Sequence, residues 1–371
     1  MKLPVLAILL ISTVLPAQTA VARSAPDTAS PAPRVTLLMS VLDVAGNPVS
    51  DLTKEQFNII DNGEPTPVLA MRRVSDAPLD LGIVLYASKA FFPQEQAAAV
   101  ALVQQIIRPN VDGAFVVTAG GSKPWAATQI NWQTDKDSIT KTIQSLDKDA
   151  GIRDAFNFEI SEDDGNSSRF WRAAVQRDQG PTIFDAVWGL MRSNPRPSRR
   201  AVIIFREPWA NSPGGDKQSA EYVSAKLAEI IRTAQQLKTP IYTIGIEDQG
   251  LMPGQDKNFA HIYVPLNAGA GASLRSYDEN TQKYRTSLYN GGKANIEQLS
   301  ENTGGRAFWD VKKNFPDAVA GIARALAGQY IFSFTAPAGR PVSPAHSLKV
   351  VPTRSGVHLD VATTYFPSQK Q

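Results

Sequence analysis

The residue types best suited to contact another protein lie just after two apolar runs. Leu81–Leu85 and Ala201–Phe205 are continuous apolar stretches, as expected of parallel strands that are covered on both faces. Tyr, Trp and Arg dominate the hot spots of protein interfaces. The segments that follow the two runs are therefore candidates for partner contact, through Tyr86, Lys89, Arg206 and Trp209.

Each of these residues also has an ordinary structural interpretation. Tyr86, at the end of a buried strand, is interpreted first as a half-buried aromatic that covers the strand end, with partner contact as the alternative. Lys89 and Arg206 are suited to be solvated charges, and a surface ion pair with Glu207 would stabilise little. Trp209 lies in a loop rich in Pro, Gly and Asn, where contact and packing are both open.

No arrangement of residues typical of catalysis is present in the sequence. The chain has no cysteine and three histidines, and it contains neither a Gly-x-Ser-x-Gly nor a His-Glu-x-x-His pattern. The remaining enzymatic alternative is a hydrolase in which Ser88 acts with a distant histidine such as His261.

Cofactor and nucleic-acid binding are not expected either. Ala268–Ser273 superficially resembles a dinucleotide loop, but it lacks the third glycine and lies in a long polar segment. The acidic run Glu162–Asp164 is interpreted as solvated, with weak attraction of Ca²⁺ as the alternative. Lys+Arg total 38 against 35 for Asp+Glu, which is too even a balance to indicate nucleic-acid binding.

The middle of the chain, from about 79 to 327, alternates buried strands with helices. Such alternation predicts a doubly wound, mainly parallel α/β sheet. Two polar stretches, about 151–179 and 248–293, interrupt it and are interpreted as insertions at the loop edge. The expected strands are 81–85, 114–119, 201–205, 241–246 and 306–309, and the expected helices are 94–107, 135–146, 182–191, 221–237, 296–302 and 316–326.

The two ends of the chain have a different, antiparallel texture. Residues 34–78 are expected to form a small meander with a tight turn at Asp61-Asn62-Gly63. Residues 328–367 contain three further strand-like segments, 330–335, 347–351 and 357–365. Because neither end has enough strands for independent stability, we expect 34–78 and 328–367 to pack into one β region.

The first residues are typical of an export signal. Met1–Lys2 is positive, Leu3–Leu15 is almost entirely apolar, and Ala20-Val21-Ala22 offers a cleavage pattern of small residues. Residues 1–22 are therefore expected to be a signal peptide, with retention as an anchor as the alternative. Residues 23–33 are expected to be a flexible spacer, and the chain to be periplasmic or extracellular.

Seven short motifs in order resemble the von Willebrand factor A-related family of acidobacterial type, over about residues 34–367. They are Asp51–Phe57, Asp61–Gly63, Leu79–Leu85, Arg200–Phe205, Ile241–Ile246, Thr303–Gly305 and Gln329–Tyr330. The resemblance implies a Rossmann-like α/β domain flanked by short β segments. In the broader class it also implies protein binding through a Mg²⁺ site at the carboxyl edge of the sheet.

This chain departs from the class at the metal site. The class pattern Asp-x-Ser-x-Ser corresponds here to Tyr86-Ala87-Ser88-Lys89-Ala90, so that the leading carboxylate is absent. The class Thr falls at Pro181 or Thr182, and the class Asp becomes Glu207. Because Mg²⁺ requires near-octahedral oxygen ligands, we expect a degenerate site that holds no metal.

The leading hypothesis is thus a non-catalytic, exported protein that binds another protein at the loop edge of its α/β domain. No cofactor is expected. The expected partner-binding residues are Tyr86, Ser88, Lys89, Thr182, Arg206, Glu207 and Trp209.

Overall fold

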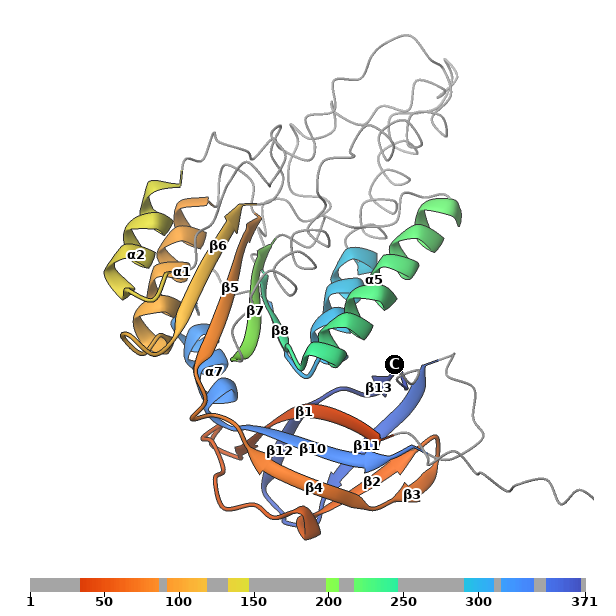
Figure 1. Cartoon of the computed structure of the whole chain (residues 1–371). Coiled ribbons are helices and arrows are strands. Elements are labelled where there is room, and N and C mark those ends of the chain that lie inside the picture. The colour runs from red at the N-terminus through yellow and green to blue at the C-terminus, as the bar shows by residue number, and fades with distance from the viewer. Residues whose placement is uncertain are drawn as a thin grey trace, which may run out of the picture.

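A parallel α/β layer and an antiparallel β sandwich make up the described part of the protein (Figure 1). The computed structural model describes residues 34–86, 92–118, 133–146, 198–206, 217–245, 290–309, 315–336 and 345–367. The expected signal peptide (1–22), spacer (23–33), first insertion (151–179) and helix 182–191 lie outside these residues. The second expected insertion ends too late, because 290–293 already belong to a helix over residues 290–301.

The parallel sheet has the strand order β6-β5-β7-β8-β9. Apolar runs form the central parts of its strands, which suits strands buried on both faces. Strand β6 carries a further antiparallel bridge between Ala114 and Gln133 on its outer side. The strands are β5 (Leu79–Tyr86), β6 (Gly113–Thr118), β7 (Arg199–Arg206), β8 (Ile241–Gly245) and β9 (Ala307–Phe308).

Helices cover both faces of this sheet (Figure 1). On one face, α1 (Phe92–Ile106) packs with α2 (Lys136–Ser145) and α7 (Phe315–Ala327). On the other lie α5 (Lys217–Leu237) and the helix over 290–301. The doubly wound arrangement predicted from the alternation of strands and helices is thereby observed.

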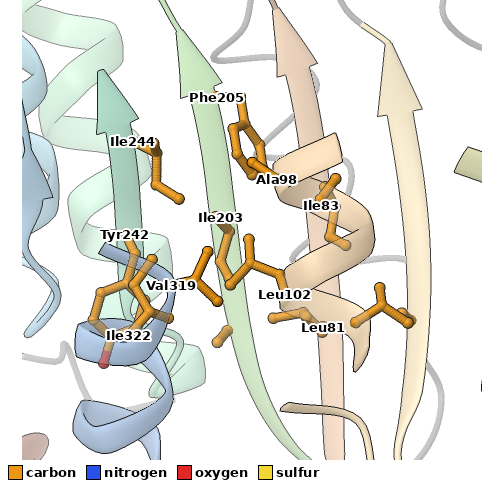
Figure 2. Close-up of a cluster of buried hydrophobic side chains, with 14 of the residues drawn as sticks. Leu81, Ile83, Ala98, Leu102, Ile203, Phe205, Tyr242, Ile244, Val319 and Ile322 are labelled. Carbon is orange, nitrogen blue, oxygen red and sulfur yellow. The ribbon is translucent and has the colours of Figure 1, made fainter. Parts of the chain in front are cut away.

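One core cluster of the α/β layer lies between the sheet and the first of these helical faces. Figure 2 shows alternate strand residues meeting the apolar sides of α1 and α7. Each fully buried Leu, Ile or Phe side chain contributes about 1.5–3 kcal/mol through removal from water. The strand residues labelled there are Leu81, Ile83, Ile203, Phe205, Tyr242 and Ile244, and the helical ones are Ala98, Leu102, Val319 and Ile322.

The sandwich combines both ends of the described chain and lies at the amino ends of the parallel strands (Figure 1). Its two sheets have the orders β12-β1-β10-β4 and β13-β11-β2-β3, and their inner faces share one apolar core. A 3₁₀ helix (Lys54–Gln56) precedes β2. The strands are β1 (Arg34–Asp43), β2 (Phe57–Asp61), β3 (Glu64–Thr66), β4 (Val68–Arg73), β10 (Gln329–Thr335), β11 (His346–Pro352), β12 (Val357–Val361) and β13 (Thr364–Tyr365).

Two expectations about the ends were wrong in detail. Residues 34–74 do not form a meander, because β1 and β4 both pair with β10 whereas β2 and β3 belong to the other sheet. Residues 357–365 are not one strand: β12 pairs with β1, and β13 pairs with β11. The break falls at Ala362–Thr363, where the Thr363 and Thr364 hydroxyls donate to the Asn302 side-chain oxygen at 2.9 Å.

A buried polar cluster closes the second sheet. The Tyr365 hydroxyl donates to Asp61 Oδ2 at 2.7 Å and lies 3.1 Å from His346 Nδ1. His346 Nδ1 is also 3.4 Å from Asp61 Oδ1. All three residues are buried, so that the carboxyl group of Asp61 is compensated by side chains from β11 and β13.

The joint between the sandwich and the α/β layer is largely polar. Arg199 Nη1 donates to the Leu326 carbonyl at 2.7 Å and to Gln329 Oε1 at 2.9 Å. The Gln235 side-chain amide donates to the Thr364 carbonyl at 2.7 Å. Burial raises the pKa of Tyr242, whose hydroxyl lies 3.5 Å from Ser40 Oγ, so that this phenol stays protonated.

An arginine–aspartate pair holds the segment that enters β5. Arg108 Nε and Nη2 each donate to the Asp112 carboxylate at 2.8 Å, and the Leu79 backbone N–H donates to it at 2.7 Å. The same guanidinium donates to the Ala77 carbonyl at 2.9 Å. Burial acts to raise the pKa of Asp112, but these hydrogen bonds outweigh it, and the pKa is lowered from its ordinary value.

Candidate functional site

The carboxyl edge of the parallel sheet contains the point where the strand order reverses. From β5 the chain adds β6 on one side, and then β7 and β8 on the other. In open α/β sheets, ligands bind outside the carboxyl ends of the strands at such a switch point. This edge faces away from the sandwich (Figure 1).

The strand register brings two of the expected site residues to this switch point. Tyr86 of β5 is the register partner of Arg206 of β7, although the two are 120 positions apart in the chain. Arg206 is in turn the partner of Gly245 at the end of β8. The backbones of these three residues therefore end side by side, at one edge.

The other expected site residues lie outside the described residues. These are Ser88, Lys89, Thr182, Glu207 and Trp209, together with His261 of the hydrolase alternative. The acidic run 162–164 and the glycine-rich stretch 268–273 lie outside as well. Chain connectivity still fixes that Ser88 and Lys89 follow the end of β5 and that Glu207 directly follows β7.

Sequence reasoning missed an aromatic residue at the same edge. Trp309 comes directly after β9, and its indole lies against Gly245, where a Cβ atom would be 2.0 Å from Trp309 Cε3. Glycine at position 245 is thus required by the close approach of this ring. The only sequence signal was a tryptophan at the end of a short strand. Such a tryptophan is equally consistent with a position in the hydrophobic core.

A lysine accompanies this tryptophan. Lys293, in the first turn of the helix over 290–301, places Nζ 5.1 Å from the centre of the Trp309 ring, within the range of a cation–π contact. Both side chains are only partly buried. Lys293 therefore brings a positive charge to the carboxyl edge, near the ends of β8 and β9.

A buried carboxyl group was also missed. Glu95 in the first turn of α1 has 0% of its surface exposed. The amino end of α1 follows the carboxyl end of β5, so Glu95 belongs to the same side of the sheet. A negative charge is favourable at a helix amino terminus. The burial of Glu95 could not be predicted from the sequence, because nothing in this Ala- and Gln-rich helix indicates that its first turn is buried.

In the described residues, no group of three or more His, Asp or Glu side chains is placed to hold a metal ion. None of the helices there is both long and apolar enough to cross a membrane.

No protein-family model and no curated protein matches this sequence. Among solved structures, the chain is similar to proximal thread matrix protein 1 from the mussel byssus, a structure with a zinc-occupied MIDAS motif. The identity is 12% and the TM-score 0.31, over 71% of this chain and 48% of that one. The chain thus spans about half the length of that protein.

Two pilus proteins are also similar. For the PilB minor pilin from Streptococcus sanguinis the identity is 9% and the TM-score 0.30, over 67% of this chain and 62% of that one. For the three N-terminal domains of the tip protein Mfa5 from Porphyromonas gingivalis the values are 9% and 0.19, over 50% and 28%. TM-scores this low support no conclusion about fold or function, and nothing in the comparisons bears on an acidobacterial origin.

Proposed function

We propose that this chain is a non-catalytic, exported protein-binding module of the von Willebrand factor A type, which receives its partner at the carboxyl edge of the parallel sheet. The observation that supports the proposal best is the reversal of strand order between β5 and β7, at which Tyr86 and Arg206 end side by side. Aromatic and arginine residues are the types that dominate interface hot spots.

In this proposal, positively charged side chains bind the acidic group of the partner, in place of the metal ion that binds it in the wider class. Arg206 is the last residue of β7, Lys89 follows β5, and Lys293 adds a third positive charge at the ends of β8 and β9. Arginine grips a carboxylate through two parallel hydrogen bonds. The preferred partner is therefore a protein that presents an acidic side chain. In this proposal Arg206 pairs with Glu207 in the free protein, and the acidic side chain of the partner replaces Glu207 on binding.

The first test is capture of a partner from the envelope of the native cell, with the immobilised protein as bait. We expect a protein that is retained by the unaltered chain and lost from the Tyr86→Ala/Trp209→Ala variant. A matched control is Lys238→Ala, which removes a surface charge at the opposite end of α5 and should retain the same protein. Equal retention by the edge variant would refute the location.

The charge mechanism is tested on the captured pair. Binding should be insensitive to chelator, weaken as salt rises, and be reduced by Arg206→Ala. Calorimetric titration with Mg²⁺ and Mn²⁺ should show no stoichiometric binding to the protein alone. Micromolar binding that Ser88→Ala abolishes would show instead that the edge is a metal site, and labelling of Ser88 by a serine-reactive probe would favour the hydrolase.

A further inference from the structure

A histidine, an aspartate and an arginine meet at the joint between the sandwich and the α/β layer. His358 and Asp360 lie on β12, and Arg306 lies between the helix over 290–301 and β9. Arg306 Nη2 is 2.6 Å from Asp360 Oδ1 and 2.5 Å from His358 Nε2. His358 Nε2 is also 3.2 Å from Asp360 Oδ1.

One tautomer of His358 makes its contact with Arg306 a hydrogen bond. Arginine has only donors and keeps its proton at every pH of interest. Its contact with His358 Nε2 is therefore a hydrogen bond only when this nitrogen is an acceptor, as it is in the neutral tautomer that carries its proton on Nδ1. The short distance between His358 and Asp360 is then a contact between two acceptors, held together by the guanidinium between them.

A second proton on His358 changes all three contacts. An N–H bond on Nε2 would point at the Arg306 guanidinium, so that a hydrogen bond becomes a contact between like charges. The same N–H would be suited to donate to Asp360 Oδ1, the oxygen that Arg306 Nε and Nη2 now share. His358 and Arg306 would then compete for one acceptor.

Two charged groups contact His358 among the described residues. They are Arg306 from the α/β layer and Asp360 from its own strand. Its register partner across the sheet is Leu42 of β1. Asp43, the next residue, is held within its own turn by the backbone N–H groups of Ala45 and Asn47.

Arg306 connects the cluster to the parallel sheet. Its carbonyl accepts a hydrogen bond from the Thr243 N–H of β8, and its guanidinium carbon lies 6.0 Å from the Phe308 ring of β9. Asp360 is 8% exposed, and its Oδ2 is buried without a hydrogen-bond partner among the described residues. Asp360 therefore depends on Arg306 for compensation of its charge.

We infer that the Arg306–His358–Asp360 cluster holds the sandwich against the α/β layer at neutral pH and that this contact weakens in acid. Histidine is the side chain that takes up a proton between pH 8 and pH 5. At neutral pH, His358 accepts from Arg306 and the joint is closed. In acid, protonated His358 repels Arg306 and competes for Asp360, so that the segment 302–309 is released from β12.

Hydrogen exchange of the full-length protein at pH 7.5 and pH 5.0, corrected for intrinsic rates, tests this inference. In the unaltered protein, protection of residues 302–309 should fall about fivefold on acidification, which corresponds to about 1 kcal/mol of like-charge repulsion in a wet environment. His358→Gln, which keeps an acceptor but cannot become charged, should abolish that fall. His346→Gln, which alters the buried histidine away from Arg306, should retain it.

The same samples separate a titrating joint from a merely structural one. The chain has three histidines, so that single substitutions assign every imidazole signal in a proton–carbon NMR spectrum. The His358 imidazole signal and the Arg306 guanidinium signal should shift together when the sample is moved from pH 7.5 to pH 5.0. If His358→Gln fails to fold, Arg306→Gln should remove the pH effect instead. An equal loss of protection in His358→Gln and the unaltered protein, or a His358 signal that moves without Arg306, would overturn the inference.

Discussion

Replacing Tyr365 by phenylalanine removes a single oxygen atom from the interior of the sandwich. The hydroxyl donates to Asp61 at 2.7 Å, and both residues are 0% exposed. The ring itself would keep its edge-on contact with Phe334, whose centre lies 5.3 Å away. The substitution therefore tests the hydrogen bond with little loss of packing.

We expect Tyr365→Phe to lower the free energy of unfolding by about 2–3 kcal/mol, the range for a hydrogen bond to a charged group whose loss leaves a buried acceptor without its donor. Urea unfolding followed by circular dichroism measures it, and with a slope of about 2 kcal/mol/M the midpoint should fall by about 1–1.5 M. The matched control is Tyr330→Phe, because the Tyr330 hydroxyl donates at 2.9 Å to the uncharged Val49 carbonyl. It should cost about 1 kcal/mol.

A double-mutant cycle shows whether the carboxyl group is the cause. In an Asp61→Asn background, Tyr365→Phe should cost clearly less than it does alone, since the buried charge is then absent. Equal costs in both backgrounds, or a Tyr365→Phe cost no greater than that of Tyr330→Phe, would refute the reasoning.

Two further predictions concern the frame that carries the site. Gly305→Ala should prevent accumulation of folded protein, because its Cβ would lie 2.0 Å from the Ile241 carbonyl oxygen; expression and size-exclusion chromatography check this, and a soluble variant of unchanged melting temperature would contradict it. Because the folded-state pKa of Asp112 is lowered, its contribution to stability is full above about pH 4, the ordinary value, and is lost as the pH falls below it. The stability advantage of the unaltered protein over Arg108→Ala, measured by urea unfolding at pH 6 and pH 2.5, should therefore shrink in acid, and a constant advantage would show that Asp112 does not titrate with the fold.

The parallel layer could be predicted closely because its signal is local. The runs 81–85, 201–205 and 241–246 correspond to β5, β7 and β8 within two residues at each end. Strands buried on both faces must be apolar at every position, and the sequence displays that directly. The register of Tyr86 with Arg206, in contrast, depends on which strands pair and how they are aligned, and only the structure gives it.

For the sandwich, the sequence predicted only that the two ends of the chain are β-rich and pack together, and not which strands pair. Strand β1 pairs with β10 across almost 300 positions, and no local pattern specifies which of several alternating segments will be neighbours. Asp61 was visible as the first residue of a turn, but its burial depends on Tyr365 and His346 at the other end of the chain. Trp309 was likewise visible only as the end of a strand, since its contact with Gly245 is set by tertiary packing.

The division of the sandwich between both ends of the chain has a consequence for how the protein acquires its structure. Strands β1 and β4 are synthesised first, yet their shared neighbour β10 leaves the ribosome only about 250 residues after β4, roughly 13–50 s later at 5–20 residues per second. Until then the apolar faces of β1 and β4 have no partner strand. Such late, non-local pairing makes for slow folding and a long exposure to aggregation. Tyr365 follows β10 in the chain, so the hydrogen bond that compensates Asp61 forms later still, about 300 residues after Asp61 itself has been synthesised.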